Sequence, residues 1–101
     1  MNDDREEVTA EQFEVIRAIV GMEAEDFRRS KLGKYIFDRN LNEEQELIEE
    51  LIACDPNDVP KNHSLRSDIQ MRRMFEKYVN EAISSGRNAE SNLDALEEGV
   101  Y

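Results

Sequence analysis

The segment C-D-P-N-D-V-P, residues 54–60, is the feature that most constrains the fold of this chain. Its two prolines fix φ and lack the amide hydrogen that a residue inside a helix donates. Aspartate and asparagine favour turns because their side chains accept hydrogen bonds from nearby backbone amides. A helix must therefore end here, and we expect the chain to double back on itself.

The segments on both sides of this turn have the apolar periodicity of helices. Thr9 and Gln12 form a capping-box pattern, which predicts a first helix over about residues 10–30. Similar spacing predicts a second helix over about 34–53 and a third over about 64–97. The third helix is expected to be continuous, because its apolar stripe keeps the same phase throughout.

The chain of 101 residues is long enough for one domain with a modest core. We expect a single helical domain over residues 9–97, preceded by a disordered acidic segment at 1–8 and followed by a frayed end at 98–101. The predicted fold is all-α, a three-helix arrangement built on a long antiparallel helical hairpin. The first helix is amphipathic, and it either packs on this hairpin or is exchanged between copies of the chain.

Several apolar residues are candidates for an interface. The first helix has an unusually broad apolar face, and Gly21 within it indicates the close approach of a neighbouring helix or a local hinge. The third helix outruns the second by roughly 14 residues, near 20 Å, so its end either packs on the first helix or projects with apolar side chains exposed. The candidate interface residues are Phe13, Ile16, Val20, Phe27, Leu93 and Leu96.

The concentrated positive charge of the chain lies in R-R-S-K-L-G-K, residues 28–34. One interpretation is that these cations occupy the last turn of the first helix, where they favour the exposed carbonyls and the negative end of the helix dipole. The other is a docking patch for an acidic protein surface or a phosphate. The candidate basic patch consists of Arg28, Arg29, Lys31 and Lys34.

The second helix carries the densest acidic surface. Its carboxylates alternate around the helix without an ordered set of facing ligands, so we interpret them as a solvated face rather than a metal site or an acid–base pair. Asn40 interrupts the apolar margin of the same helix, and we expect it to face water. The candidate acidic surface consists of Glu43, Glu44, Glu46, Glu49 and Glu50.

Catalytic, cofactor and metal sites are not predicted. Cys54 and His63 are the only residues of their types, so neither belongs to a zinc-binding cluster. The glycine-rich phosphate loops, the G-x-S-x-G motif and the H-E-x-x-H motif do not occur in the sequence. We therefore expect a protein that is not an enzyme and needs no cofactor.

The formal charge of −11 bears on the partners of the chain. A strongly acidic protein is poorly suited to binding nucleic-acid phosphates or an anionic membrane directly, because both need concentrated lysine and arginine. The sequence contains no apolar run of roughly 18 residues, and its acidic start differs from a secretory signal. A single cysteine fits a reducing compartment, so we expect a cytoplasmic location.

Four sequence segments resemble short acidic helical proteins of tailed bacteriophages. They are G-K-Y-I-F-D-R at 33–39, D-P-N-D at 55–58, S-D-I-Q at 67–70 and N-E-A-I-S-S-G-R-N-A-E-S-N-L at 80–93. The resemblance extends over about residues 30–95, and it implies a viral origin without implying an activity. The chain departs from the pattern at Asn40, where alanine is expected, and in a longer and more polar linker.

Two functions follow as hypotheses. The first is a non-enzymatic interaction or assembly protein of phage type, which acts through apolar helix faces on itself, a virion component or a host protein. The second is an acidic inhibitor that blocks the nucleic-acid site of a host defence, transcription or repair protein. We expect a homo-oligomer, which would favour the first hypothesis, whereas a monomer would favour the second. The expected location is the cytoplasm of an infected bacterium or the virion.

Overall fold

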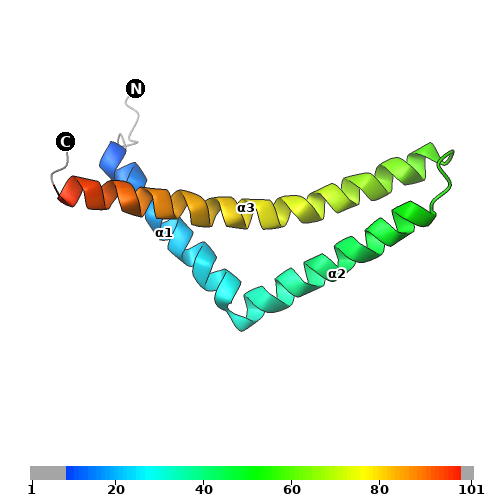
Figure 1. The fold of residues 1–101 in the computed structure, drawn as a ribbon, viewed down its shortest axis with the longest axis horizontal. Coiled ribbons are helices and arrows are strands. Elements are labelled where there is room, and N and C mark those ends of the chain that lie inside the picture. Colours follow the sequence, from blue (N-terminus) through cyan, green and yellow to red (C-terminus); the bar gives the residue numbers. More distant parts are fainter. Residues whose placement is uncertain (1–8, 99–101) are drawn as a thin grey trace, which may run out of the picture.

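The computed structural model describes residues 9–98, and it consists of three α-helices (Figure 1). The helices are α1 (Ala10–Arg29), α2 (Lys31–Ala53) and α3 (Val59–Glu97). No strand occurs within residues 9–98, so the all-α prediction is confirmed. The predicted disorder of residues 1–8 lies outside the described residues. Of the residues predicted to fray, 98–101, only Glu98 is described, and it is the C-cap of α3.

Helix α1 begins as the sequence predicts. The amide of Gln12 donates to Oγ1 of Thr9 over 3.1 Å, and the amide of Thr9 donates to Oε1 of Gln12 over 2.9 Å. These two hydrogen bonds form a capping box, which satisfies amides that have no partner within the first turn.

Helix α2 begins three residues earlier than predicted, because Ser30 caps two helices at once. Its extended backbone ends α1, and its amide donates to the carbonyl of Asp26 over 3.0 Å. Its hydroxyl oxygen accepts a hydrogen bond from the amide of Gly33 over 2.9 Å, which starts α2. Gly33 lies in this first turn, where a side chain would overlap the carbonyl of Phe27. The basic segment therefore spans a sharp corner between two helices.

Helix α3 begins at Val59, five residues earlier than predicted. Asp58 is its N-cap and accepts a hydrogen bond from the amide of Lys61 over 3.3 Å. Pro60 is tolerated because it lies in the first turn, where an amide hydrogen would have no partner in the helix. The helix then continues without interruption for 39 residues, about 58 Å.

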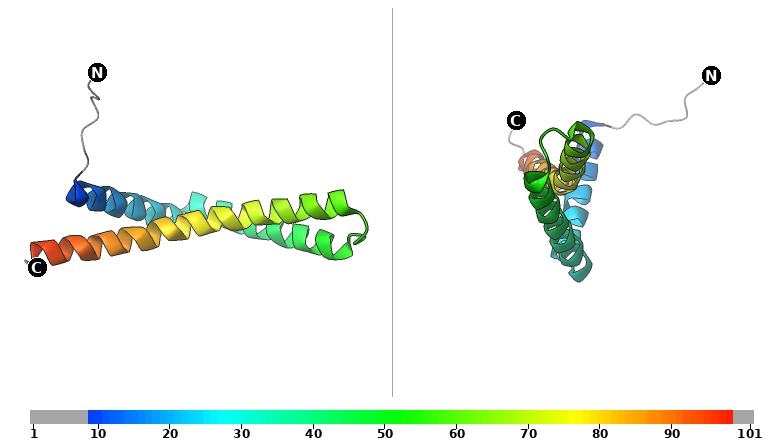
Figure 2. Two further views of the ribbon diagram at one scale, coloured as in Figure 1. Left: turned by 90° about the horizontal axis from the view of Figure 1, so that it is seen from above. Right: turned by 90° about the vertical axis from the view of Figure 1, so that its right-hand side faces the viewer.

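Helices α1 and α2 lie one after the other along α3, and both run antiparallel to it (Figures 1 and 2). In the N-terminal half of α3, Nε of Arg73 lies 2.9 Å from Oε2 of Glu44 in α2. In the C-terminal half, Nδ2 of Asn92 donates to Oε2 of Glu14 in α1 over 2.8 Å. The end of α3 therefore packs on α1 and does not project alone.

The arrangement is elongated and buries few residues. The radius of gyration is 20.0 Å, whereas a compact domain of this length has a radius near 13 Å. Among residues 9–98, no large side chain is fully buried. The buried apolar residues are Ala18, Leu65, Ile69, Ile83 and Ala89. A single copy thus has a thin core.

Aromatic side chains from all three helices pack together between α3 and the corner of α1 and α2. The ring centroid of Phe37 in α2 lies 6.1 Å from that of Phe27 in α1 and 5.2 Å from that of Phe75 in α3. The guanidinium carbon of Arg28 lies 5.0 Å from the centroid of Phe37, a distance that allows a cation–π interaction. This cluster fixes the angle between α1 and α2.

Candidate protein interaction surface

Two glycines lie where α1 crosses α3. A Cβ atom added to Gly21 would stand 2.6 Å from the Cα of Gly86, so the two backbones are in direct contact. Ala18 of α1 and Ala89 of α3 are buried beside this crossing. Helix α1 therefore presents its small residues to α3, and its large apolar residues are left on other sides of the helix.

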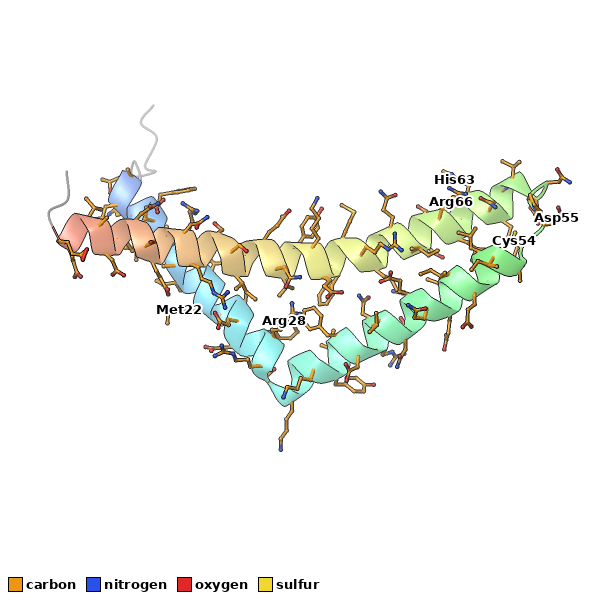
Figure 3. All side chains as sticks on the ribbon, in the orientation of Figure 1. Met22, Arg28, Cys54, Asp55, His63 and Arg66 are labelled. Carbon is orange, nitrogen blue, oxygen red and sulfur yellow. The ribbon has the colours of Figure 1, made fainter. Side chains whose placement is uncertain are left out.

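These large apolar residues form what we call the α1 outer face. Each of them has between 41 % and 57 % of its surface exposed. The α1 outer face consists of Phe13, Val15, Ile16, Ile19, Val20 and Met22. Figure 3 shows Met22 pointing away from α3. The first helix is thus amphipathic in the unusual sense that its more apolar side faces solvent.

The other candidate interface residues lie elsewhere. Phe27 continues the stripe of Phe13 and Val20 by helical spacing, but it is half-buried in the aromatic cluster with Phe37. In α3, Leu93 is half-buried, and Leu96 is 42 % exposed. Three of the six candidates therefore lie together on the α1 outer face, and three do not.

Polar contacts hold α1 on α3 around the glycine crossing. Nε of Arg17 donates to Oγ of Ser85 over 2.8 Å, and Nη1 of Arg17 lies 2.6 Å from Oε1 of Glu14. The hydrogen bond from Asn92, together with Arg17, lowers the pKa of Glu14 below its ordinary value of 4.5. These contacts fix the rotation of α1, so its outer face is held toward solvent.

The candidate basic patch is largely engaged within the chain. Arg28 points into the corner between the helices and donates to Oδ1 of Asn80 (Figure 3). Nη2 of Arg29 lies 2.6 Å from Oε2 of Glu25, which also pairs with Arg87 at 3.4 Å. Lys31 and Lys34 are exposed. The patch therefore does not form one free cluster of cations.

The candidate acidic surface is divided between two roles. Oε1 of Glu43 lies 3.1 Å from Nη2 of Arg72, and Glu44 pairs with Arg73, so both carboxylates bind α3. The other members are exposed: Glu46, Glu49 and Glu50. Because two of the five carboxylates are half-buried in ion pairs, the surface is only partly the solvated face that the sequence predicts.

Asn40 does not face water as we expected. It is half-buried, and its Nδ2 donates to the backbone carbonyl of Arg72 in α3 over 2.9 Å. This hydrogen bond joins the side chain of Asn40 to the backbone of α3 and helps to fix the register between α2 and α3. The sequence shows an interrupted apolar margin but not the carbonyl that lies opposite.

The described residues contain neither a metal-binding cluster nor a membrane-spanning helix. Within residues 9–98, no three histidine, cysteine, aspartate or glutamate side chains are grouped to hold a metal ion. Figure 3 places Cys54 at the end of α2 and His63 near the start of α3. None of the helices in the described range has the length and apolar character needed to cross a membrane.

Comparison with known proteins adds no relative. No family model, no curated protein and no solved structure matches the chain. The α1 outer face must therefore be interpreted from its own geometry.

Proposed function

We propose that this protein is a non-enzymatic interaction or assembly protein that acts through the α1 outer face. The observation that carries the proposal is the orientation of α1. Its small residues contact α3, and its large apolar residues face solvent. From the sequence resemblance to acidic helical proteins of tailed phages, we propose that this role belongs to phage assembly or to takeover of the host.

The size of the exposed surface supports an interface. The half-exposed side chains of the α1 outer face leave on the order of 500 Å² of apolar surface in water. This area is at the upper end of the largest apolar patches that soluble monomers expose. Covering it would contribute about 25 cal/mol for each Å² removed from water, or roughly 12 kcal/mol before the entropy lost on association. Because association itself costs about 4–15 kcal/mol, this gain permits stable association when the partner also buries a matching apolar surface.

The inhibitor hypothesis has weaker support from the contacts of α2. A protein that occupies a nucleic-acid site needs free carboxylates along one face. Glu43 and Glu44 instead neutralise Arg72 and Arg73 within the chain. We therefore favour the α1 outer face over the acidic surface as the functional surface.

Site-specific photocrosslinking tests the proposal. A benzophenone amino acid placed at Ile16, in the middle of the α1 outer face, should yield discrete adducts with protein in expressing cells. The matched control carries the same group at Ser91, an exposed residue of α3 that lies five positions from Gly86 and so points away from α1. The absence of discrete adducts at Ile16, or the same adducts from both positions, would contradict the proposal.

A further inference from the structure

The α1 outer face has the same apolar pattern when it is read in either direction. Residues 13–22 have the sequence F-E-V-I-R-A-I-V-G-M, and their large apolar side chains form three pairs, each centred on the midpoint between Arg17 and Ala18. The pairs are Ile16 with Ile19, Val15 with Val20, and Phe13 with Met22. A surface with this symmetry suits an isologous dimer, in which the same patch of two copies meets across a two-fold axis.

The middle of the α1 outer face points away from α3. Successive residues of a helix are turned by about 100°, so the direction midway between Ile16 and Ile19 lies about 170° from that of Gly21. Gly21 is the residue whose backbone touches α3. A helix that packs along the middle of this face therefore lies on the side of α1 opposite to α3.

We propose that a second copy of the chain covers the α1 outer face, with the two α1 helices antiparallel and a two-fold axis beside the midpoint between Arg17 and Ala18. Ile16 and Ile19 of both copies then surround the axis. The inference rests on the proposed function and names the partner of the same surface.

This register brings large apolar side chains together on both sides of the axis. On one side, Phe13 lies beside Val20 of the partner subunit. On the other side, Val15 lies beside Met22 of the partner subunit. In each case the two residues differ in height by only about 3 Å along the helix. The six residues of each copy therefore contact the same six residues of the other.

The rest of the chain leaves room for this pairing. In the antiparallel pair the partner's α1 begins beside Glu25, before the corner at Ser30 where α2 begins. Helix α2 then turns toward the N-terminal half of α3 (Figure 1). The two copies thus meet through α1 alone, with α3 of each copy on the far side of its own α1.

Polar residues at the ends of the face favour the antiparallel orientation. Gln12 and Glu23 are exposed and equidistant from the same midpoint, so the side-chain amide of one copy lies opposite the carboxylate of the other. The capping box uses Oε1 of Gln12, and Nε2 is the atom that would donate across the interface. Asp26 comes near the start of the partner's α1, where the positive end of the helix dipole favours a carboxylate. A parallel pair would instead place Glu23 beside its own copy, and like charges disfavour that orientation.

The available area suits a dimer. Each α1 outer face leaves on the order of 500 Å² of apolar surface in water, so two copies can cover about 1,000 Å², to which the polar margins add. A specific interface buries at least about 1,000 Å² in total. Among residues 9–98, one copy has no large side chain fully buried, and a domain with so little core gains stability from a second copy.

Disulfide trapping tests this arrangement, with Cys54 first replaced by serine so that the chain has no other thiol. Ile19→Cys should form a disulfide-linked dimer on mild oxidation, because its two copies lie only about 4.5 Å apart along the helix axis. Met22→Cys is the matched control, at a site of similar exposure on the same face. Its two copies lie about 13.5 Å apart along the axis, and a disulfide joins Cα atoms at most about 7 Å apart, so it should not crosslink.

Each other outcome of the trapping overturns the inference. Crosslinking at both positions indicates a parallel pair or random collision. Crosslinking at neither position, or at residue 22 alone, shows that the axis does not lie beside the midpoint of the apolar pattern.

If circular dichroism shows that either cysteine variant has lost its helix content, an exchange of charges decides instead. Gln12→Glu keeps the capping box, which accepts either residue, but it places a carboxylate opposite Glu23 of the partner subunit. It should weaken the dimer several-fold in sedimentation equilibrium at low salt. Adding Glu23→Lys should restore the dimer, because the new carboxylate then faces a cation.

The matched control for this exchange is Gln12→Glu with Glu46→Lys, which has the same net charge and changes an exposed residue of α2. It should not restore the dimer. A monomeric wild-type chain, failure of Glu23→Lys to restore the dimer, or equal restoration by Glu46→Lys overturns the inference.

Photocrosslinking from Ile16 separates this inference from the proposed function. Adducts with a second copy of the chain support both. Adducts that contain only other proteins refute the dimer and leave the proposed function standing, whereas the absence of adducts refutes both.

Discussion

At the scale of single residues, Gly21 and Gly86 set the distance between α1 and α3. Neither position has room for a side chain, because a Cβ on either glycine would stand 2.6 Å from the Cα of the other. Gly21 is thus a point of close approach, one of the two interpretations that its sequence position allows. The exposure of the α1 outer face depends on this pair.

Replacing Gly86 by alanine should destabilise the protein. Alanine favours the helix by about 1 kcal/mol, but crowding a tight contact costs about 1–3 kcal/mol, and here the opposing atoms belong to backbone that cannot rotate away. We expect a net loss of up to about 2 kcal/mol in the free energy of unfolding, measured by urea denaturation at fixed protein concentration. Ser84→Ala, at an exposed site of the same helix, is the control and should be nearly neutral. A Gly86→Ala variant more stable than wild type would contradict the close contact.

Glu14 should titrate below pH 4.5, and Asn92 should be the main cause. The hydrogen bond from Asn92 is the largest effect that lowers the pKa of Glu14. A lowered pKa means that this carboxylate stabilises the folded state above pH 4.5, and that the contribution is lost as the pH falls through the folded value. Asn92→Ala should raise the pKa toward 4.5, as measured by NMR of the carboxyl carbon. Ser91→Ala should leave it unchanged, and an unchanged value in Asn92→Ala would refute the contact.

At the scale of the elements, Ser30 determines where α1 ends and α2 begins. Ser30→Ala removes the acceptor of the Gly33 amide and the donor to the carbonyl of Phe27. Loss of such a cap costs about 0.5–2 kcal/mol. We expect a decrease of this size in the free energy of unfolding, with Ser84→Ala again as the control. Equal stability of the two variants would show that the corner does not depend on the cap.

Sequence patterns predict the helices better than their relative placement. The capping box at Thr9 and the turn at residues 54–60 are local, so the number of helices and the start of α1 follow from them. Helices α2 and α3 begin earlier than predicted. Ser30 caps both α1 and α2, and Pro60 is compatible with the first turn of α3. The packing partners of Asn40 and Glu43 lie in α3, and such distant contacts leave no local pattern.

The candidate surface was predictable only in part. Apolar spacing identifies Phe13, Ile16 and Val20 as core or interface, and it cannot separate the two, because both need the same residues. Whether these residues belong to the core or to an interface depends on the contact between Gly21 and Gly86, which turns the small residues of α1 toward α3. Periodicity alone likewise assigns Met71 and Tyr78 to the core. Both are exposed in the structure because of where α2 lies on α3.

At the scale of the whole molecule, α1 packs on the C-terminal half of the long helix α3 and α2 packs on its N-terminal half (Figures 1 and 2). These contacts hold the chain together through small residues, one aromatic cluster and ion pairs. The α1 outer face leaves most of the large apolar side chains of α1 exposed. We propose that copies of the chain associate through this face.

Solution mass tests this claim most directly. Light scattering on a sizing column should give a mass of at least two chains of 11.8 kDa each, at low and at high salt, because contacts between apolar surfaces are not screened by ions. Val20→Glu should shift the mass toward that of one chain, since it places a carboxylate in the middle of the interface. A wild-type mass of 11.8 kDa at both salt concentrations would contradict the claim that copies of this chain associate through the α1 outer face.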